Sequence, residues 1–224
     1  MNQLGLPLSL NSKMLLSNFI GKRNQQVLDF VNQLFTQKGS AVVFISGVKS
    51  SGKTHLLQGC ALSALDKRLN VVFIDIKQEL PKEVISDLAP VDWICIDNVD
   101  CLSIVQQQAL FDLHNRIKLT NTKLIVSASG LSSELNLLKD LKTRLSLAVA
   151  FTLETLNDEQ KILIIERKMV DKNININSKV YYYLFKVLSR DLNDVLNIIS
   201  VLDEASLQQK SNISIPFVKQ TLGI

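Results

Sequence analysis

Residues 47–54 read G-V-K-S-S-G-K-T and match the pattern G-x-x-x-x-G-K-[ST] at every fixed position. The stretch follows an apolar run at 41–46, which has the length of a strand buried on both faces, and it precedes a predicted helix at 53–66. The glycines allow a tight loop whose N–H groups turn inward, and the helix adds the positive end of its dipole. The segment therefore predicts a phosphate-binding loop, with an ordinary structural turn as the alternative.

Strands and helices alternate around this loop. Further apolar runs of strand length lie at 71–74, 93–96, 123–127 and 148–153. Helical spacing of apolar residues marks 25–35, 105–119 and 133–145. The alternation predicts an α/β fold in which a parallel sheet is flanked by helices.

The pattern changes after residue 156. Helical spacing continues at 158–171, 178–188 and 191–207, and Pro216 opens a last short helix. The predicted organisation is an extended arm at 1–15, an α/β nucleotide-binding domain at 16–156 and a small all-helical domain at 157–224.

Composition excludes several classes of protein. Of 224 residues, 46% are apolar and 21% are charged, as in ordinary globular proteins and unlike disordered, collagen-like or disulfide-rich chains. The net charge of +4 is compatible with a polyanionic partner but does not require one. No membrane span and no signal peptide are predicted, so a cytoplasmic protein is expected. Cys60, Cys95 and Cys101 lack the spacing of metal ligands and are expected to be buried thiols.

The loop and the third apolar strand carry the candidate nucleotide site. Lys53 can neutralise β- and γ-phosphate oxygens, while Thr54 and Asp97 can hold Mg²⁺. Asn98 follows Asp97 where many ATPases of this layout place a carboxylate that activates water, so slow intrinsic hydrolysis is expected. Further predicted nucleotide-binding residues in and beside the loop are Gly47, Ser50, Ser51, Gly52 and His55, for the last of which packing is the simpler account.

Residues 18–25, N-F-I-G-K-R-N-Q, resemble the opening segment of the bacterial replication initiator DnaA. In that family the segment covers the adenine base, which implies nucleotide contacts for Asn18, Phe19, Ile20 and Gly21. With the phosphate loop and Asp97, the resemblance places the chain in the AAA+ class and implies that the helical domain is a lid.

The resemblance is closer still to the Hda family of DnaA-homologous regulatory inactivators. Residues 111–117, F-D-L-H-N-R-I, look like that family's F-D-L-Y-N-R-I, and residues 215–222, I-P-F-V-K-Q-T-L, look like its I-P-F-V-K-x-x-L. The segment at 3–8, Q-L-G-L-P-L, looks like its sliding-clamp-binding Q-L-x-L-P-L. The similarity extends along nearly the whole chain, and no region is left for the helix-turn-helix DNA-binding domain of a full initiator.

The N-terminal segment also has a physical rationale. Leu4, Leu6 and Leu8 with Pro7 form a short, stiff apolar strip, and Gln3 can hydrogen-bond at the edge of a partner's groove. An arm packed on its own domain is the alternative, and the resemblance favours binding to the clamp.

The resemblance implies roles for two more residues, Arg144 and Ser127, and shows a departure from the family at Asn193. Arg144, in L-K-T-R-L, matches the arginine finger that acts in trans, although a surface arginine is the plain alternative. Ser127 matches a polar sensor at a strand end, where serine is also ordinary. Asn193 stands where the family's lid carries a phosphate-binding arginine, and Arg190 lies one helical turn away.

These features imply an ADP- or ATP-bound protein with Mg²⁺ and at most weak ATPase activity of its own. It would dock on the DNA-loaded sliding clamp, stimulate hydrolysis of ATP on the DnaA initiator and prevent re-initiation. DNA contact would be indirect or weak, nucleoid association would come through the clamp, and homo-oligomerisation stays open. A DnaA-related helicase loader or initiation factor is the alternative, and a small-molecule kinase is disfavoured because no acceptor pocket is visible.

Overall fold

A computed structural model describes residues 10–21, 24–78, 81, 83–88, 91–171, 174, 176–188 and 191–224. The chain divides into two compact units, Met1–Thr155 and Leu156–Ile224. The first unit is built on a five-stranded sheet whose neighbouring strands are parallel and lie in the order β2-β3-β4-β1-β5. The strands are β1 Ala41–Ser46, β2 Val71–Asp75, β3 Trp93–Asp97, β4 Lys123–Ala128 and β5 Val149–Thr152.

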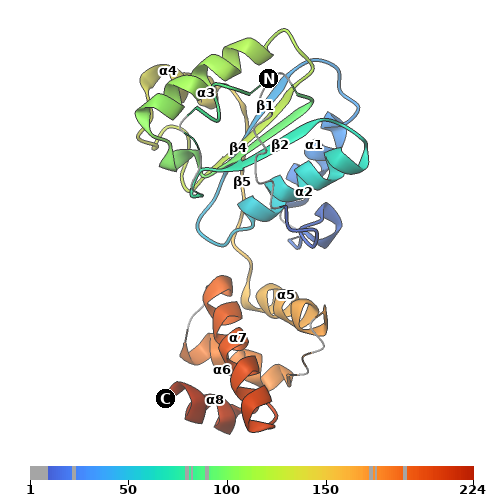
Figure 1. Ribbon diagram of the computed structural model, residues 1–224, viewed down its shortest axis with the longest axis vertical. Helices are drawn as coiled ribbons and strands as arrows, with labels where there is room; N and C mark the ends of the chain where they lie inside the picture. The colour runs from blue at the N-terminus through green and yellow to red at the C-terminus, as the bar shows by residue number, and fades with distance from the viewer. Residues whose placement is uncertain are drawn as a thin grey trace. The chain divides into compact units, whose positions relative to one another are not determined.

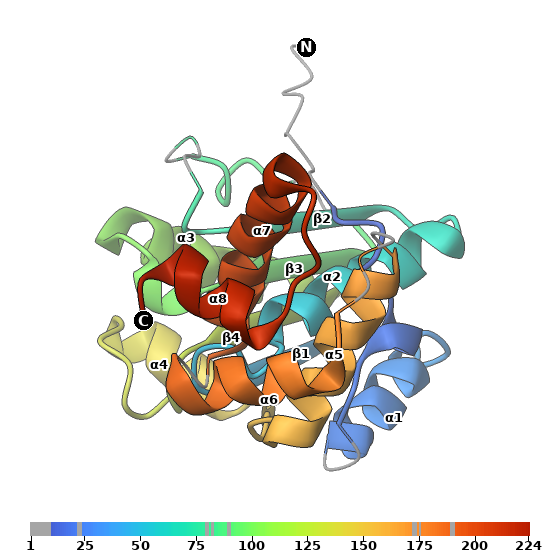
Figure 2. The same cartoon turned by 90° about the horizontal axis from the view of Figure 1, so that it is seen from below.

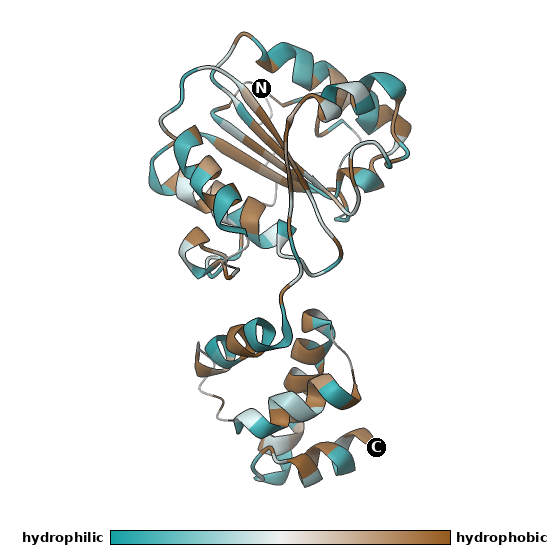
Figure 3. Ribbon diagram, turned by 180° about the vertical axis from the view of Figure 1, so that it is seen from behind, coloured by the Kyte–Doolittle hydropathy of each residue, from teal (hydrophilic) through white to brown (hydrophobic). Residues whose placement is uncertain are grey.

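Helices cover both faces of this sheet (Figure 1). One face carries α1 (Gln25–Leu34) and α2 (Lys53–Asp66), and the other carries α3 (Ile104–Ile117) and α4 (Lys139–Ser146). The strands are almost continuously hydrophobic, as Figure 3 shows. The central strands β3 and β4 are buried along their whole length and β1 along most of it, whereas the edge strand β5 is mostly exposed. The predicted α/β class is confirmed.

Alternate residues of the inner strands enter different cores. Phe44 and Ile96 pack with α3 and α4, whereas Ile45 and Cys95 pack with α1 and α2. The side chains alternate because successive residues of a strand point to opposite faces of the sheet. The sheet therefore holds the ends of its strands rigidly, and the candidate site is built on those ends.

Trp93 is expected to be a major contributor to stability. Its side chain is 2% exposed, and its ring stacks on Phe35 with the ring centroids 4.3 Å apart. Replacing Trp93 by alanine should lower the free energy of unfolding by about 3–5 kcal/mol, because a large cavity would remain. Urea denaturation measures this change.

Leu119→Ala is the matched control, because Leu119 is 98% exposed and its truncation should change the free energy of unfolding by less than about 0.5 kcal/mol. A loss below about 1 kcal/mol in Trp93→Ala would contradict a central role for the stacked pair.

The described residues of the second unit form four helices around a core of their own, grouped in Figure 2: α5 Asp158–Asp171, α6 Ser178–Val187, α7 Leu192–Gln209 and α8 Ile215–Leu222. Leu184, Ile199 and Val218 are fully buried at its centre. Ser214 caps α8 by accepting a hydrogen bond from the N–H of Phe217. No helix among the described residues is long and apolar enough to cross a membrane.

Two expectations were wrong. The helix predicted from residue 133 begins at Lys139, because Leu138 has a non-helical backbone with ψ 137° and its N–H donates to Gln107 Oε1 on α3 at 2.8 Å. Cys101 is exposed, since the single turn of 3-10 helix at Val99–Cys101 buries Val99 instead. Cys60 and Cys95 are buried thiols as expected.

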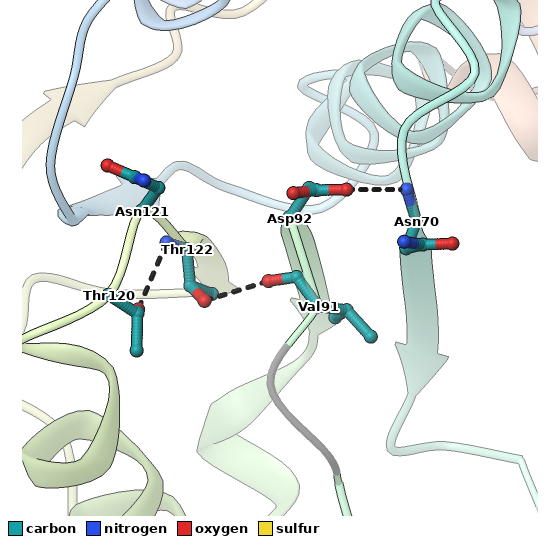
Figure 4. Close-up of a pocket in the computed structure, with 6 residues that line it drawn as sticks. All are labelled: Asn70, Val91, Asp92, Thr120, Asn121 and Thr122. Atoms are coloured by element: carbon teal, nitrogen blue, oxygen red, sulfur yellow. Dashed lines mark hydrogen bonds between the residues drawn. The ribbon is translucent and has the colours of Figure 1, made fainter.

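A small polar pocket of about 230 Å³ lies at the amino ends of β2, β3 and β4 (Figure 4). Asp92 accepts a hydrogen bond from the N–H of Asn70 at 2.8 Å, and Thr122 Oγ1 donates to the carbonyl of Val91 at 2.7 Å. These hydrogen bonds join the starts of the strands to one another, so the residues that line the pocket have a structural role. The phosphate loop lies at the opposite, carboxyl edge of the sheet.

Candidate nucleotide site

The loop between β1 and α2 has a backbone that only glycine tolerates at two positions. Gly52 has φ +98°, and a Cβ there would lie 3.0 Å from the ring of Phe19. A Cβ on Gly47 would lie 2.6 Å from Ser51 Oγ. Ser50 lies between them and is left-handed at φ 62°. This geometry gives the tight, inward-turned loop that the sequence pattern predicts.

Lys53, the first residue of α2, directs its ammonium group back onto the loop. Nζ donates to the carbonyl oxygens of Gly47 at 2.6 Å and Val48 at 2.9 Å. Burial lowers the pKa of Lys53, and the nearby carboxylates of Asp97 and Asp100 partly oppose this shift. A positive charge is thus held against the loop, where bound phosphate oxygens would meet it.

Thr54 and Asp97 form the centre of the site. The Thr54 hydroxyl donates to Asp97 Oδ2 at 2.5 Å, and Asp97 is fully buried at the end of β3. The other oxygen, Oδ1, accepts hydrogen bonds from the Ser127 hydroxyl and from the N–H of Asn98. The carboxyl ends of parallel strands meet at one edge of a sheet, so β3 and β4 bring these groups together.

These residues fit a magnesium–nucleotide complex. A hydroxyl and a carboxylate are the hard oxygen ligands that Mg²⁺ prefers, and phosphates and water complete its octahedron. No group of three His, Cys, Asp or Glu side chains that could hold a metal by itself exists among the described residues. Ser51 Oγ is buried and has no hydrogen-bond partner within the described part of the chain, and a phosphate oxygen would satisfy it.

The segment before α1 packs onto the start of α2. Phe19 meets His55 edge to face, with ring centroids 5.5 Å apart, and His55 Nε2 donates to the Leu15 carbonyl at 2.9 Å. The Asn18 side chain donates to the carbonyl of Lys13 at 3.1 Å. Phe19 therefore lies directly beside Gly52 of the loop, and His55 has a packing role. Ile20 and Gly21, both half-buried, continue the segment.

The structure adds one residue that the sequence reasoning missed. Asp75, the last residue of β2, lies beside Asp97 in register, and its Oδ1 accepts a hydrogen bond from Asn98 Nδ2 at 2.8 Å. The signal was an acidic residue directly after a buried apolar run, the same signal that marked Asp97.

Arg144 is not part of this group. It lies half-buried in the last turn of α4, and its guanidinium carbon is 5.9 Å from the centre of the Phe111 ring. His114 on α3 is 9% exposed, and burial, Lys118 and Arg144 together lower its pKa. The Arg144 guanidinium lies over the face of an aromatic ring.

The other predicted site residues are not placed. Gln3, Leu4, Leu6, Pro7 and Leu8 of the clamp segment lie outside the described residues, and so does Arg190. Asn193 belongs to α7, but its side chain also lies outside the description.

Comparison with known proteins places the chain in a family. The family model "Hda, lid domain" matches residues 158–222. An uncharacterized protein of Haemophilus influenzae is 31% identical over 230 residues, which cover 99% of each chain.

Solved structures share the fold. Domain III of the replication initiation protein DnaA from Thermotoga maritima superposes with a TM-score of 0.77 at 19% identity, over 96% of this chain and 97% of that one. A replication initiator DnaA bound to AMPPCP and single-stranded DNA gives a TM-score of 0.68 at 22% identity, over 90% and 69% of the two chains. Three findings agree: the parallel sheet carries a phosphate loop, a relative matches nearly the whole chain, and the lid matches the Hda lid model. The chain therefore belongs to the Hda/DnaA-related family of AAA+ proteins.

Proposed function

We propose that this protein is a nucleotide-bound regulator of replication initiation. It binds ADP or ATP with Mg²⁺, docks on the DNA-loaded sliding clamp and stimulates hydrolysis of the ATP held by the DnaA initiator. The observation that carries this proposal is a site equipped for phosphate and magnesium, with an amide at the position where a hydrolytic carboxylate is expected. Such a site suits a protein that keeps its nucleotide.

The residues of the loop support nucleotide binding. Lys53 supplies the positive charge, and Thr54 with Asp97 supplies two oxygens for the metal. Ser51 adds a buried hydroxyl that has no hydrogen-bond partner among the described residues. Phe19 beside Gly52 provides an apolar surface next to the loop, suited to a base. Magnesium, when bound, neutralises part of the phosphate charge.

Asn98 supports a regulatory role. A carboxamide is not basic enough to take a proton from water at neutral pH, so the protein's own turnover should stay below about one per second. The hydrolysis that matters would then occur on the initiator, and Arg144 would be inserted toward the γ-phosphate there.

Clamp docking is proposed for residues 3–8. Replacing Gln3 and Leu6 by alanine should abolish retention on an immobilised clamp, because the change removes the polar anchor and the central apolar contact of a short segment. Surface plasmon resonance measures retention, and Asn2→Ala with Ser9→Ala, which flank the segment, is the control. Unchanged retention would mean that the arm packs on its own domain.

The deciding experiment measures ATP hydrolysis by the cognate initiator, with and without this protein, in the presence of clamp loaded on DNA. Stimulation that disappears when the clamp is omitted is the expected result. If a competent initiator and clamp show no stimulation, the proposal fails and a role as helicase loader takes its place. DNA-stimulated ATP turnover by the protein alone would also favour a role as helicase loader.

A further inference from the structure

Asp75 and Asn98 form a pair at the carboxyl edge of the sheet that the phosphate loop alone does not explain. β2 and β3 run side by side with Asp75 opposite Asp97, so the residue after Asp97 comes within reach of β2. Asn98 Nδ2 donates to Asp75 Oδ1 at 2.8 Å, and the N–H of Lys77 donates to the same oxygen at 3.0 Å. The pair connects two strands at the edge that carries Thr54 and Asp97.

The backbone of Asn98 is held in place for this contact. Its φ and ψ are 62° and 46°, in the left-handed region, which asparagine tolerates better than most residues. Its N–H donates to Asp97 Oδ1 at 3.1 Å and lies 3.3 Å from Ser127 Oγ. Asn98 is only 8% exposed, so the amide is fixed at both its backbone and its side chain.

The hydrogen bond to Asp75 decides which end of the Asn98 carboxamide can interact with another group. A carboxylate accepts and does not donate, so the Asn98 nitrogen must face Asp75 and the carbonyl oxygen must face away from it. A hydrogen bond to a charged acceptor is roughly twice as strong as one between neutral groups, which holds this orientation firmly.

We propose that Asp75 is a positioning residue that acts through Asn98: it turns the carboxamide so that its oxygen orders the water beside a bound nucleotide. The pair holds this water without accepting its proton, since an amide is not a base. The carboxylate that could accept it sits one strand away and is occupied by the amide. This inference rests on the nucleotide binding proposed above and explains how the site can hold a water in place without a base to activate it.

Exchanging the two residues tests the pair. Asp75→Asn combined with Asn98→Asp rebuilds the carboxylate–carboxamide bond with the carboxylate on β3. Water oxygen could then bond to the γ-phosphorus as the bond to the β,γ-bridging oxygen breaks, while the introduced carboxylate takes the water's proton. We expect turnover at least about tenfold above wild type, with a new acid limb in the pH profile of kcat, because a general base contributes about 10²–10⁴-fold.

The two single variants distinguish a role of Asp75 in positioning the Asn98 amide from a role in stabilising the fold. Asn98→Asp alone places two carboxylates in contact, and we expect a smaller gain than in the exchanged protein because like charges repel. Asp75→Asn alone frees the amide to turn, and we expect a several-fold lower kcat with affinity for a fluorescent ATP analogue within about threefold of wild type.

Asp66→Asn is the matched control, because it removes the same charge from an exposed residue at the end of α2. Its turnover and affinity should equal those of wild type. If the exchanged protein melts at the wild-type temperature and binds the analogue with wild-type affinity, yet hydrolyses ATP no faster than either single variant, the proposed role of the Asp75–Asn98 pair is overturned. Wild-type protein that binds no nucleotide overturns the proposed function itself, so the two failures are distinguishable.

Discussion

Replacing Arg144 by alanine should reduce the stimulation of initiator-bound ATP hydrolysis by about 10³-fold or more. An arginine supplied in trans stabilises the charge that develops on the γ-phosphate oxygens, and its removal leaves that charge without its partner. In this protein the guanidinium is held near the Phe111 ring, 5.9 Å from its centre, and is therefore presented in a restricted position. Single-turnover hydrolysis by the initiator, with clamp loaded on DNA, measures the effect.

Two further variants make the test specific. Arg144→Lys keeps the charge but lacks the planar fork, so it should recover only a small part of the stimulation. Lys139→Ala removes one positive charge from an exposed residue at the start of the same helix and should leave stimulation unchanged. Full stimulation by Arg144→Ala, at normal clamp retention, would show that Arg144 is a surface residue without this role.

Lys53→Ala should weaken nucleotide binding by about 100-fold or more. Charge-assisted hydrogen bonds contribute about 1.5–3 kcal/mol each, and each 1.4 kcal/mol corresponds to a factor of ten. The ammonium group that now donates to the Gly47 and Val48 carbonyls can donate to two phosphate oxygens instead. Titration with a fluorescent ATP analogue measures the dissociation constant.

The control for this prediction is Lys49→Ala, which removes a lysine from the exposed part of the same loop and should change affinity by less than about threefold. Thermal unfolding of both variants shows whether the loop still folds, since Lys53→Ala also leaves two loop carbonyls without a donor. Affinity close to wild type in a folded Lys53→Ala protein would contradict the assignment of the phosphate site.

Most of the fold follows from local patterns. The strands were predictable because each carries a continuous apolar run, and the second unit because its apolar spacing stays helical. The start of α4 was not predictable, because it depends on a hydrogen bond that the Leu138 N–H donates to Gln107, a residue of another helix. Tertiary contacts of this kind leave no trace in a local window of sequence.

The same division applies to the candidate site. Lys53, Thr54 and Asp97 could be identified from a motif and from a strand end, and the structure brings them together. Asp75 carried the same local signal as Asp97, an acid after an apolar run, but its contact with Asn98 depends on the register of β2 against β3, which joins residues from separate parts of the chain. The bond of His55 to Leu15 likewise required the path of the segment before α1.

The position of β1 in the sheet has a consequence for how the protein is made. β1 carries the phosphate loop and pairs on one side with β4, beginning at Lys123, and on the other with β5, beginning at Val149. Both partners leave the ribosome long after β1, and pairings between distant segments form slowly. A nascent chain that ends before β4 contains the whole G-x-x-x-x-G-K-T sequence but lacks both strands that hold it, so we expect the proposed nucleotide binding to begin only when the α/β unit is nearly complete.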